Sequence, residues 1–150
     1  SPSLLIFFFI CLVIQISLGA LVSGLDAGQI YTSWPLMGQS YFPDDSSLKD
    51  LLSLSSFENP SLVQFMHRNM AYIIFLLFFI ILIKGYQNSD FIYLRKNILI
   101  VFLFLIFQIF LGIFTIIYGA QIFIASMHQI GSIFLISTSL ILIFKNSKIN

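Results

Sequence analysis

His67 and His128 are the two residues of this sequence whose type and position are best suited to chemistry. Both stand in long apolar stretches, and an ionisable side chain inside a membrane is costly and usually functional. His67 lies seven residues after Pro60, and His128 lies six residues after Ile122. With a rise of ~1.5 Å per residue, both histidines lie roughly 10 Å from the same end of their helices. This shared depth predicts that the two imidazoles bind one ligand together.

Two neutral imidazoles on parallel helices can ligate the iron of a porphyrin from both faces, and the core of a four-helix bundle can hold the ring. Zinc and di-iron sites fit less well, because the sequence has no cysteine pair and the histidine helices carry no carboxylate at that depth. The residues therefore favour a bis-histidine haem as cofactor. The alternative is that each histidine is a core residue whose ring is satisfied by a neighbouring group.

Arg68 follows His67 directly and would lie near the outer edge of such a site. Its fork-shaped guanidinium suits a carboxylate, so it is a candidate partner for a haem propionate. The alternative for Arg68 is snorkelling towards the lipid headgroups.

The composition requires that these residues be held inside a membrane. Hydrophobic residues make up 59% of the 150 residues, charged residues make up 9%, and the mean hydropathy is +1.01. These values exclude a soluble globular domain. The formal net charge is +1, so there is no basic field and we expect no nucleic-acid partner. Cys11 is the single cysteine, which excludes an internal disulfide.

Four apolar segments are long enough to cross a bilayer, which takes ~20 helical residues. The second segment reaches this length if its helix begins near Pro60, since proline suits a first helical turn. The last uncharged stretch is too long for one crossing, and Tyr118 to Gln121 form the break that divides it. The predicted fold is therefore an all-α, polytopic membrane protein, a single domain over 1–150 that forms a four-helix bundle. The predicted spans are 4–25, 60–83, 97–117 and 122–144, and the loop 26–59 joins the first two.

The charges of the loops predict how the chain is oriented. The loop 26–59 holds five acidic residues against Lys49, whereas the segments after the second and fourth spans are basic. By the positive-inside rule the basic segments face the cytoplasm or matrix, and the loop 26–59 lies outside. Within this loop the stretch 46–56 has four leucines after a serine start. It suits a short helix that lies on the membrane as a lid, or an ordinary amphipathic loop helix.

An internal repeat is indicated by two glutamine–glycine pairs. QISLG begins at Gln15 in the first span and QIFLG begins at Gln108 in the third, while the second and fourth spans each carry one histidine. The order glutamine helix, histidine helix thus occurs twice, which predicts a pseudo-two-fold axis along the membrane normal. Small and polar residues follow each pair at helical spacing, and close helix packing is the alternative explanation for them.

Four segments of this chain resemble the C-terminal half of haem A synthase, the membrane enzyme that converts haem O to haem A for cytochrome oxidase. They are GALVSGLDAGQIYTSWPLMG over 19–38, NPSLVQFMHRNMAY over 59–72, LGIFTIIYG over 111–119 and MHQIGS over 127–132. The resemblance implies half of an eight-helix protein built from two similar four-helix halves, each with two histidines near the outer face. It also implies that His67 and His128 hold a resident haem b.

In the family's N-terminal half, taken as the site of haem O oxidation, a glutamate stands three residues before the first histidine. The matching residue here is Gln64. A neutral amide cannot take a proton as a carboxylate does, so the resemblance implies that this half alone is not catalytic. The alternative for Gln64 is a hydrogen bond within the bundle.

The resemblance implies an oxidoreductase as the full-length protein, with successive oxidation of a porphyrin methyl group to a formyl group. The implied partners are membrane lipid, the N-terminal half of the same protein, haem O as substrate, and haem O synthase or oxidase assembly factors. The implied location is a bacterial plasma membrane or a mitochondrial inner membrane, and we expect the sequence to be a fragment or one half of a larger protein. The alternative function is a membrane b-type cytochrome that carries electrons between a quinone and a partner.

Overall fold

A computed structural model of the chain describes residues 2–148, and these residues are helical over most of their length. Four helices are long and apolar enough to cross a membrane, as the all-α prediction requires. The described residues contain no β-strand, and Met37 and Ser40 form an isolated bridge. The α-helices are α1 (Pro2–Gly24), α2 (Leu48–Leu51), α3 (Pro60–Gln87), α4 (Arg95–Ile117) and α5 (Ile122–Ser147).

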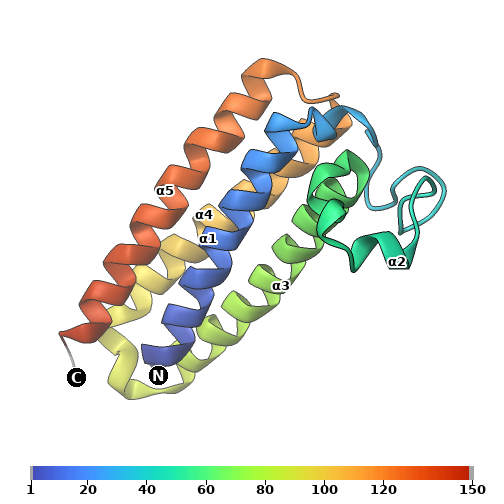
Figure 1. The fold of residues 1–150 in the computed structure, drawn as a ribbon. Helices are drawn as coiled ribbons and strands as arrows, with labels where there is room; N and C mark the ends of the chain where they lie inside the picture. Colours follow the sequence, from blue (N-terminus) through green and yellow to red (C-terminus); the bar gives the residue numbers. More distant parts are fainter. Residues whose placement is uncertain (1, 149–150) are drawn as a thin grey trace.

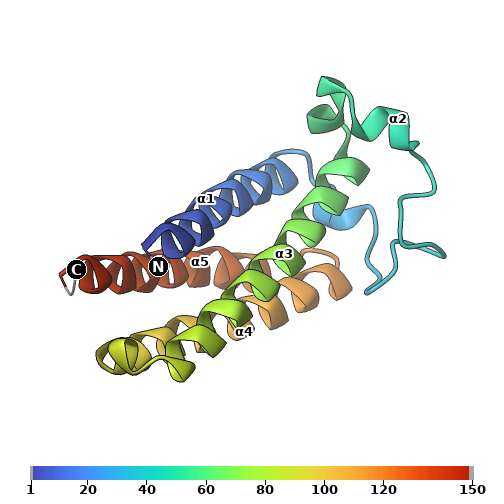
Figure 2. The same cartoon turned by 90° about the horizontal axis from the view of Figure 1, so that it is seen from below.

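The four long helices form a bundle in which neighbours in space run in opposite directions (Figures 1 and 2). The pairs α1 with α3 and α4 with α5 pack most extensively, and α3 with α4 and α1 with α5 close the ring. This order places α3 and α5 at opposite corners of the bundle, running in the same direction. The two histidine helices therefore face each other across the core.

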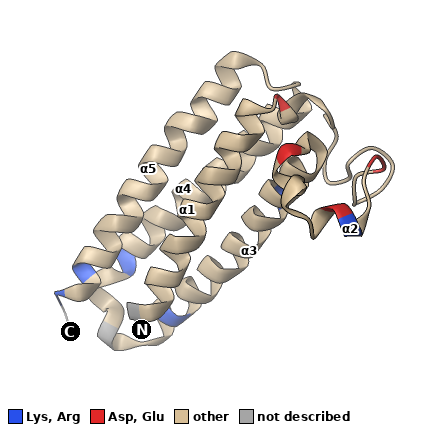
Figure 3. Ribbon diagram, in the orientation of Figure 1, with Lys and Arg blue, Asp and Glu red and all other residues tan. Residues whose placement is uncertain are grey.

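The two ends of the bundle differ in charge, and Figure 3 shows this polarity. Most of the lysines and arginines gather where α3, α4 and α5 meet the N-terminus of α1, which we call the inner end. The acidic residues that Figure 3 colours gather at the opposite end, in the loop between α1 and α3, which we call the outer end. The names follow the orientation that the positive-inside rule predicts.

The apolar core is concentrated in the inner half of the bundle. Phe8 of α1 and Phe78 of α3 are 1% and 0% exposed and their ring centres lie 4.7 Å apart. Val101 of α4 and Leu142 of α5 complete the same cluster. In the outer half the buried side chains include Gln64, Arg68 and Gln108. Most of the apolar packing that holds the helices together therefore lies below the level of the histidines.

The ends of α3 are set by capping residues and not by the positions of the charged residues in the sequence. Asn59 caps α3, because its Oδ1 accepts hydrogen bonds from the amides of Ser61 and Leu62 at 2.9 and 3.3 Å, and Pro60 fills the first turn. At the other end α3 continues past Lys84 to Gln87, a turn beyond the predicted span 60–83. A short 3₁₀ segment, Ser89–Leu94, then leads into α4.

The connection between α4 and α5 lies where the sequence predicts the break, at 118–121. Gly119 and Ala120 both adopt left-handed conformations, with φ of 62° and 55°. Glycine adopts this conformation without steric cost, which explains why the chain can reverse here within four residues. The short connection holds α4 and α5 as an antiparallel hairpin.

The predicted helix over 46–56 is broken into two short pieces. α2 is one turn long and ends where the Ser53 hydroxyl donates to the carbonyl oxygen of Asp50 at 2.8 Å. A 3₁₀ segment, Leu54–Glu58, follows. Leu52 and Leu54 are each 89% exposed, and both views show α2 projecting to the side of the outer end of α3 (Figures 1 and 2). The serines at the turn compete for the backbone and prevent one continuous helix.

Candidate functional site

The imidazoles of His67 and His128 meet in the outer half of the bundle core. Their ring centres lie 6.5 Å apart and their planes are at 86° to each other. One ring comes from α3 and the other from α5, at opposite corners of the bundle. The shared depth that the sequence indicates thus corresponds to close approach in space.

This separation fits two nitrogen ligands on a single metal. A metal–imidazole bond is about 2 Å long and the ring centre lies about 1 Å further on, so two axial imidazoles on one ion have centres about 6 Å apart. Among the residues that the structure describes, no group of three or more His, Cys, Asp and Glu is placed to hold a metal ion. The site therefore offers two imidazoles as donors, a set that suits a metal whose remaining ligands come from a macrocycle.

A glycine lies against each of the two rings. A Cβ atom added at Gly19 of α1 would stand 3.2 Å from Cε1 of His67, and one added at Gly112 of α4 would stand 3.1 Å from Cε1 of His128. Each imidazole thus packs onto the backbone of the neighbouring helix at a point where a larger residue would make a tight contact with the ring. The pair α1 and α3 thus makes the same glycine–histidine contact as the pair α4 and α5.

The glutamine one turn before each glycine lies beside the same ring. The Gln15 amide nitrogen donates to the main-chain oxygen of His67 at 3.1 Å and lies 3.3 Å from its ring Nε2. The Gln15 amide keeps the His67 main-chain oxygen as a partner in either case. The ring Nε2 of His67 can therefore bind another ligand without leaving the Gln15 amide unpaired. In the second pair of helices the main chain of Gln108 lies beside the His128 ring. The QISLG and QIFLG strings thus share the contact of a glycine with a histidine ring, whereas their glutamine side chains are placed differently.

The side chain of Gln108 occupies a notch in α5. A Cβ added at Gly131 would stand 1.8 Å from Gln108 Nε2, so only glycine at this position admits the amide. Gln108 is 6% exposed, and its Nε2 has no hydrogen-bond partner in the described residues. An unpartnered buried amide costs about 1–3 kcal/mol, so this donor is available to a bound group.

Unpartnered buried polar atoms are concentrated around the two histidines. Leaving such an atom unpaired is unfavourable, and several together indicate a place where a ligand or water belongs. Among the described residues the set is Gln15 Oε1, Gln64 Oε1, His67 Nδ1, Arg68 Nε, Gln108 Nε2 and His128 Nδ1. All six belong to the outer half of the bundle, and they support a bound group between α3 and α5.

Arg68 is buried, with 6% exposure, and holds the outer loop onto the bundle. Its Nη1 donates to the carbonyl oxygens of Ser33 and Leu36 at 2.9 and 3.4 Å, and its Nη2 donates to the carbonyl oxygen of Tyr31 at 2.9 Å. Nε remains unpartnered. The guanidinium thus binds main-chain oxygens of the loop, and its pairing with a propionate stays a prediction.

Gln64 lies one turn before Arg68 on the same helix and is 1% exposed. Its Nε2 donates to the carbonyl oxygen of Tyr31 at 3.0 Å, which is also an acceptor for Arg68. The amide therefore makes a hydrogen bond that a carboxylate could not donate. Its Oε1, which has no partner, faces the buried interior.

The contacts of the outer loop were not predictable from residue types. They use main-chain oxygens of Tyr31, Ser33 and Leu36, whose positions no side chain in the sequence signals. Burial, with Asp45 nearby as the next cause, raises the pKa of the Tyr31 phenol. Tyr31 therefore carries a neutral hydroxyl at ordinary pH, and this hydroxyl accepts a hydrogen bond from the amide of Asp44 within the loop at 3.2 Å.

Two further hydrogen bonds fasten the loop to α3. Trp34 Nε1 donates to the hydroxyl of Tyr72 at 3.0 Å, and the Tyr41 hydroxyl donates to the side-chain oxygen of Asn69. Trp34 and Tyr41 are aromatic, and such side chains suit the membrane interface. The loop 26–59 thus covers the outer end of α3, close to His67.

Comparison with known proteins gives one family. The model of the cytochrome oxidase assembly protein family matches residues 2–140. The haem A synthase of Pelagibacter ubique is 46% identical over 97% of this chain and 43% of its own length. Those of Roseobacter denitrificans and Rickettsia prowazekii are 41% and 39% identical, over 86% and 89% of this chain and 32% and 40% of their own lengths.

The chain thus spans less than half the length of these relatives. No solved structure matches it.

Proposed function

Because this chain belongs to the haem A synthase family of cytochrome oxidase assembly proteins, we propose that it forms the haem b-binding half of a haem A synthase. The full-length protein would oxidise haem O to haem A, and this half would carry the resident cofactor. Haem O, the N-terminal half and the other proteins of oxidase assembly are the partners in this proposal. The four membrane-spanning helices suit the plasma membrane of a bacterium.

The observation that carries the proposal is the 6.5 Å between the ring centres of His67 and His128. The unpartnered amide of Gln108 and the other unpartnered buried polar atoms around the rings support it further. In the alternative that the sequence left open, in which each histidine is a core residue satisfied by a neighbour, these atoms would have partners within the bundle.

The residues of this site have distinct roles in the proposal. His67 and His128 would hold the iron, and haem b, when bound, supplies a centre that takes up and releases one electron. Gly19 and Gly112 allow each imidazole to lie against a helix backbone. Arg68 ties the outer loop over the site and keeps Nε for an acidic group of the ligand.

Gln64 supports the assignment of oxidation to the other half of the protein. It donates to the Tyr31 carbonyl oxygen and cannot accept a proton from a reacting group as a carboxylate would. In this proposal the present half contributes binding and electron transfer, and no proton-transfer step is assigned to it.

The test is the absorption spectrum of the purified full-length protein. His67→Ala and His128→Ala should each abolish the low-spin bis-histidine spectrum and lower bound haem b per polypeptide by more than tenfold. Gln129→Ala is the matched control, because Gln129 adjoins His128 on α5 but is exposed, and it should retain the full spectrum. Unchanged haem b in both histidine variants would refute the proposed ligands.

A second experiment separates the enzyme from a plain electron carrier. The complete gene is expressed in a host that lacks its own haem A synthase, and haem A is extracted and quantified. Haem A should be formed with the complete gene and should be absent without it. Oxidation of quinol by the purified protein with no haem A formed in the host would favour a b-type cytochrome instead.

A further inference from the structure

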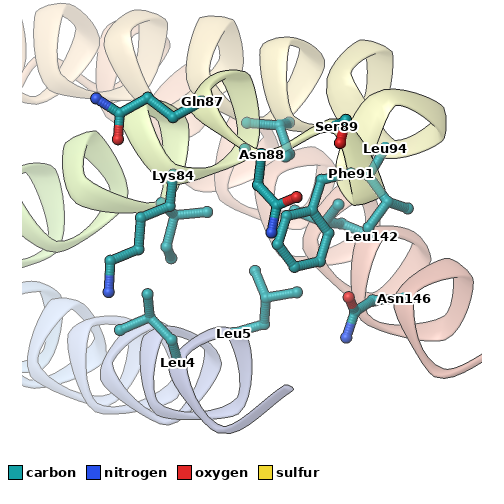
Figure 4. A pocket seen from close by; sticks show the side chains of 13 residues that line it. Leu4, Leu5, Lys84, Gln87, Asn88, Ser89, Phe91, Leu94, Leu142 and Asn146 are labelled. Atoms are coloured by element: carbon teal, nitrogen blue, oxygen red, sulfur yellow. The ribbon is translucent and has the colours of Figure 1, made fainter. Parts of the chain in front are cut away.

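A cavity of about 470 Å³ opens at the inner end of the bundle, remote from the two histidines. Its volume lies within the ~300–1,000 Å³ range of small-molecule sites. Figure 4 shows the lining side chains, which come from the four long helices and the segment between α3 and α4. The lining residues are Leu4, Leu5, Ile81, Lys84, Gly85, Gln87, Asn88, Ser89, Phe91, Leu94, Ile98, Leu142 and Asn146.

The cavity has an apolar floor and a polar rim. Leu94 and Leu142, which are 2% and 1% exposed, belong to the core cluster and form part of the floor. At the rim, Figure 4 shows the side chains of Lys84 and Asn88 reaching towards α1, with Asn146 facing them from α5. A ligand held here would thus meet apolar groups on one side and an ammonium and amides on the other.

Lys84 is the cation of this cavity. Among the side chains that the structure describes, Lys84 has no ion pair and no hydrogen-bond partner. The neighbouring cations are engaged elsewhere, since Arg95 donates to the carbonyl oxygens of Gly85 and Tyr86 and Lys145 donates to Asn97 Oδ1. Of the described cations at this end, Lys84 is thus the one that lines the cavity and can meet an anion that enters it.

The position of the cavity selects the kind of anion. It lies where α3 leaves the predicted hydrocarbon region at the basic, inner end (Figure 3), which is the level of the lipid headgroups of the inner leaflet. Anionic lipids are attracted to basic residues at this level, and basic pockets between transmembrane helices bind their headgroups. A lysine that only snorkels to the surface needs no cavity with an apolar floor.

We propose that this cavity binds the headgroup of an anionic phospholipid from the inner leaflet. The phosphate lies at the Lys84 ammonium, and the glycerol and upper acyl carbons lie against Leu4, Leu5 and the apolar floor. The site is independent of the haem between His67 and His128.

The test uses the complete protein, purified and delipidated in detergent, and native mass spectrometry to count bound lipid. Phosphatidylglycerol should bind more tightly than phosphatidylcholine of the same acyl chains. Lys84→Gln should weaken phosphatidylglycerol binding about fivefold, the effect of one basic residue near a membrane surface. Lys84→Arg keeps the charge and should retain binding.

Lys96→Gln is the matched control, since Lys96 is exposed near the same end but does not line the cavity. It should leave phosphatidylglycerol binding unchanged. Thermal unfolding of the lipid-free variants checks that both fold as the wild type does.

Two outcomes would overturn the proposal. One is equal binding of the two lipids, or an equal loss in Lys84→Gln and Lys96→Gln. The other is displacement of phosphatidylglycerol by inorganic phosphate at the same concentration, which would show a site for a free anion and not for a lipid.

Discussion

Replacing Gly19 by alanine is a direct test of how the imidazole of His67 is seated. The added Cβ would stand 3.2 Å from Cε1 of His67, where ordinary contact begins at 3.4 Å, so the ring must move by about 0.2 Å (3.4 − 3.2). Without a ligand the ring is free to make this shift. A ring that is bonded to iron is fixed by the bond, and the contact then becomes overpacking.

The expected effects on stability and on haem binding have opposite signs. Alanine is favoured over glycine in a helix by about 1 kcal/mol, so the haem-free variant should be as stable as the wild type or more so. Overpacking costs about 1–3 kcal/mol, so haem affinity should fall roughly fivefold to 150-fold. Gly112→Ala, with a Cβ at 3.1 Å from His128 Cε1, should behave alike.

The assay is haem b bound per polypeptide, titrated into the haem-free protein, together with the electron paramagnetic resonance spectrum of the ferric form. Gly24→Ala is the control on the same helix, because a Cβ there has nothing within 4 Å. Wild-type affinity and an unshifted spectrum in Gly19→Ala and Gly112→Ala would show that neither ring is confined by its glycine.

Three further changes have defined outcomes. Arg68→Ala removes the donors that hold the outer loop and should release haem several-fold faster than Lys96→Ala, measured by transfer to apomyoglobin; equal rates would contradict this role. Asn59→Ala removes the cap of α3 and should lower the free energy of unfolding by about 1 kcal/mol, measured by denaturant titration in micelles, and no change would mean that water replaces the cap. Hydrogen bonds from Ser47 lower the pKa of Asp50, so their stabilisation of α2 is present above the ordinary carboxyl pKa and is lost as pH falls through the lowered one. Ser47→Ala should move the Asp50 pKa upwards in a carbon-13 NMR titration, and an unmoved pKa would exclude the capping box as its cause.

The sequence was sufficient for the four membrane-spanning helices and for the place of the histidines. Hydropathy fixes a transmembrane helix because every backbone group must be satisfied within the segment. With the helices fixed, the depth of His67 and His128 follows from residue counts alone. That their ring centres lie 6.5 Å apart could be learned only from the structure, because this distance depends on which helices lie at opposite corners of the bundle.

The outer loop could not be predicted in the same way. Its attachment depends on main-chain carbonyl oxygens, and every residue type carries one, so neither Arg68 nor Gln64 has a partner that the sequence identifies. The stretch 46–56 has the leucine spacing of a helix, yet Ser53 ends α2 by bonding to the Asp50 carbonyl oxygen. At this position the hydrogen bond of Ser53 decides where the helix ends, and the leucine spacing does not.

The cavity at the inner end is also invisible in the sequence, because its lining residues come from the four long helices and from the segment between α3 and α4, and only the fold brings them together. Lys84 stands in a segment whose charge suits the positive-inside rule, and nothing in its neighbours distinguishes it from Lys96. Only the positions of Leu5 and Leu142 in space separate a lysine over a cavity from a lysine in solvent.

The uneven distribution of the apolar core has a consequence for how a haem bound as proposed would enter the bundle. Phe8, Phe78, Val101 and Leu142 tie the four helices together at the inner end, so the outer ends can separate while this base stays closed. A large flat molecule could then enter from the outer end after the helices are already inserted. Insertion of the chain and loading of the proposed haem would thus be separable events, and the empty bundle would not need to unfold between them.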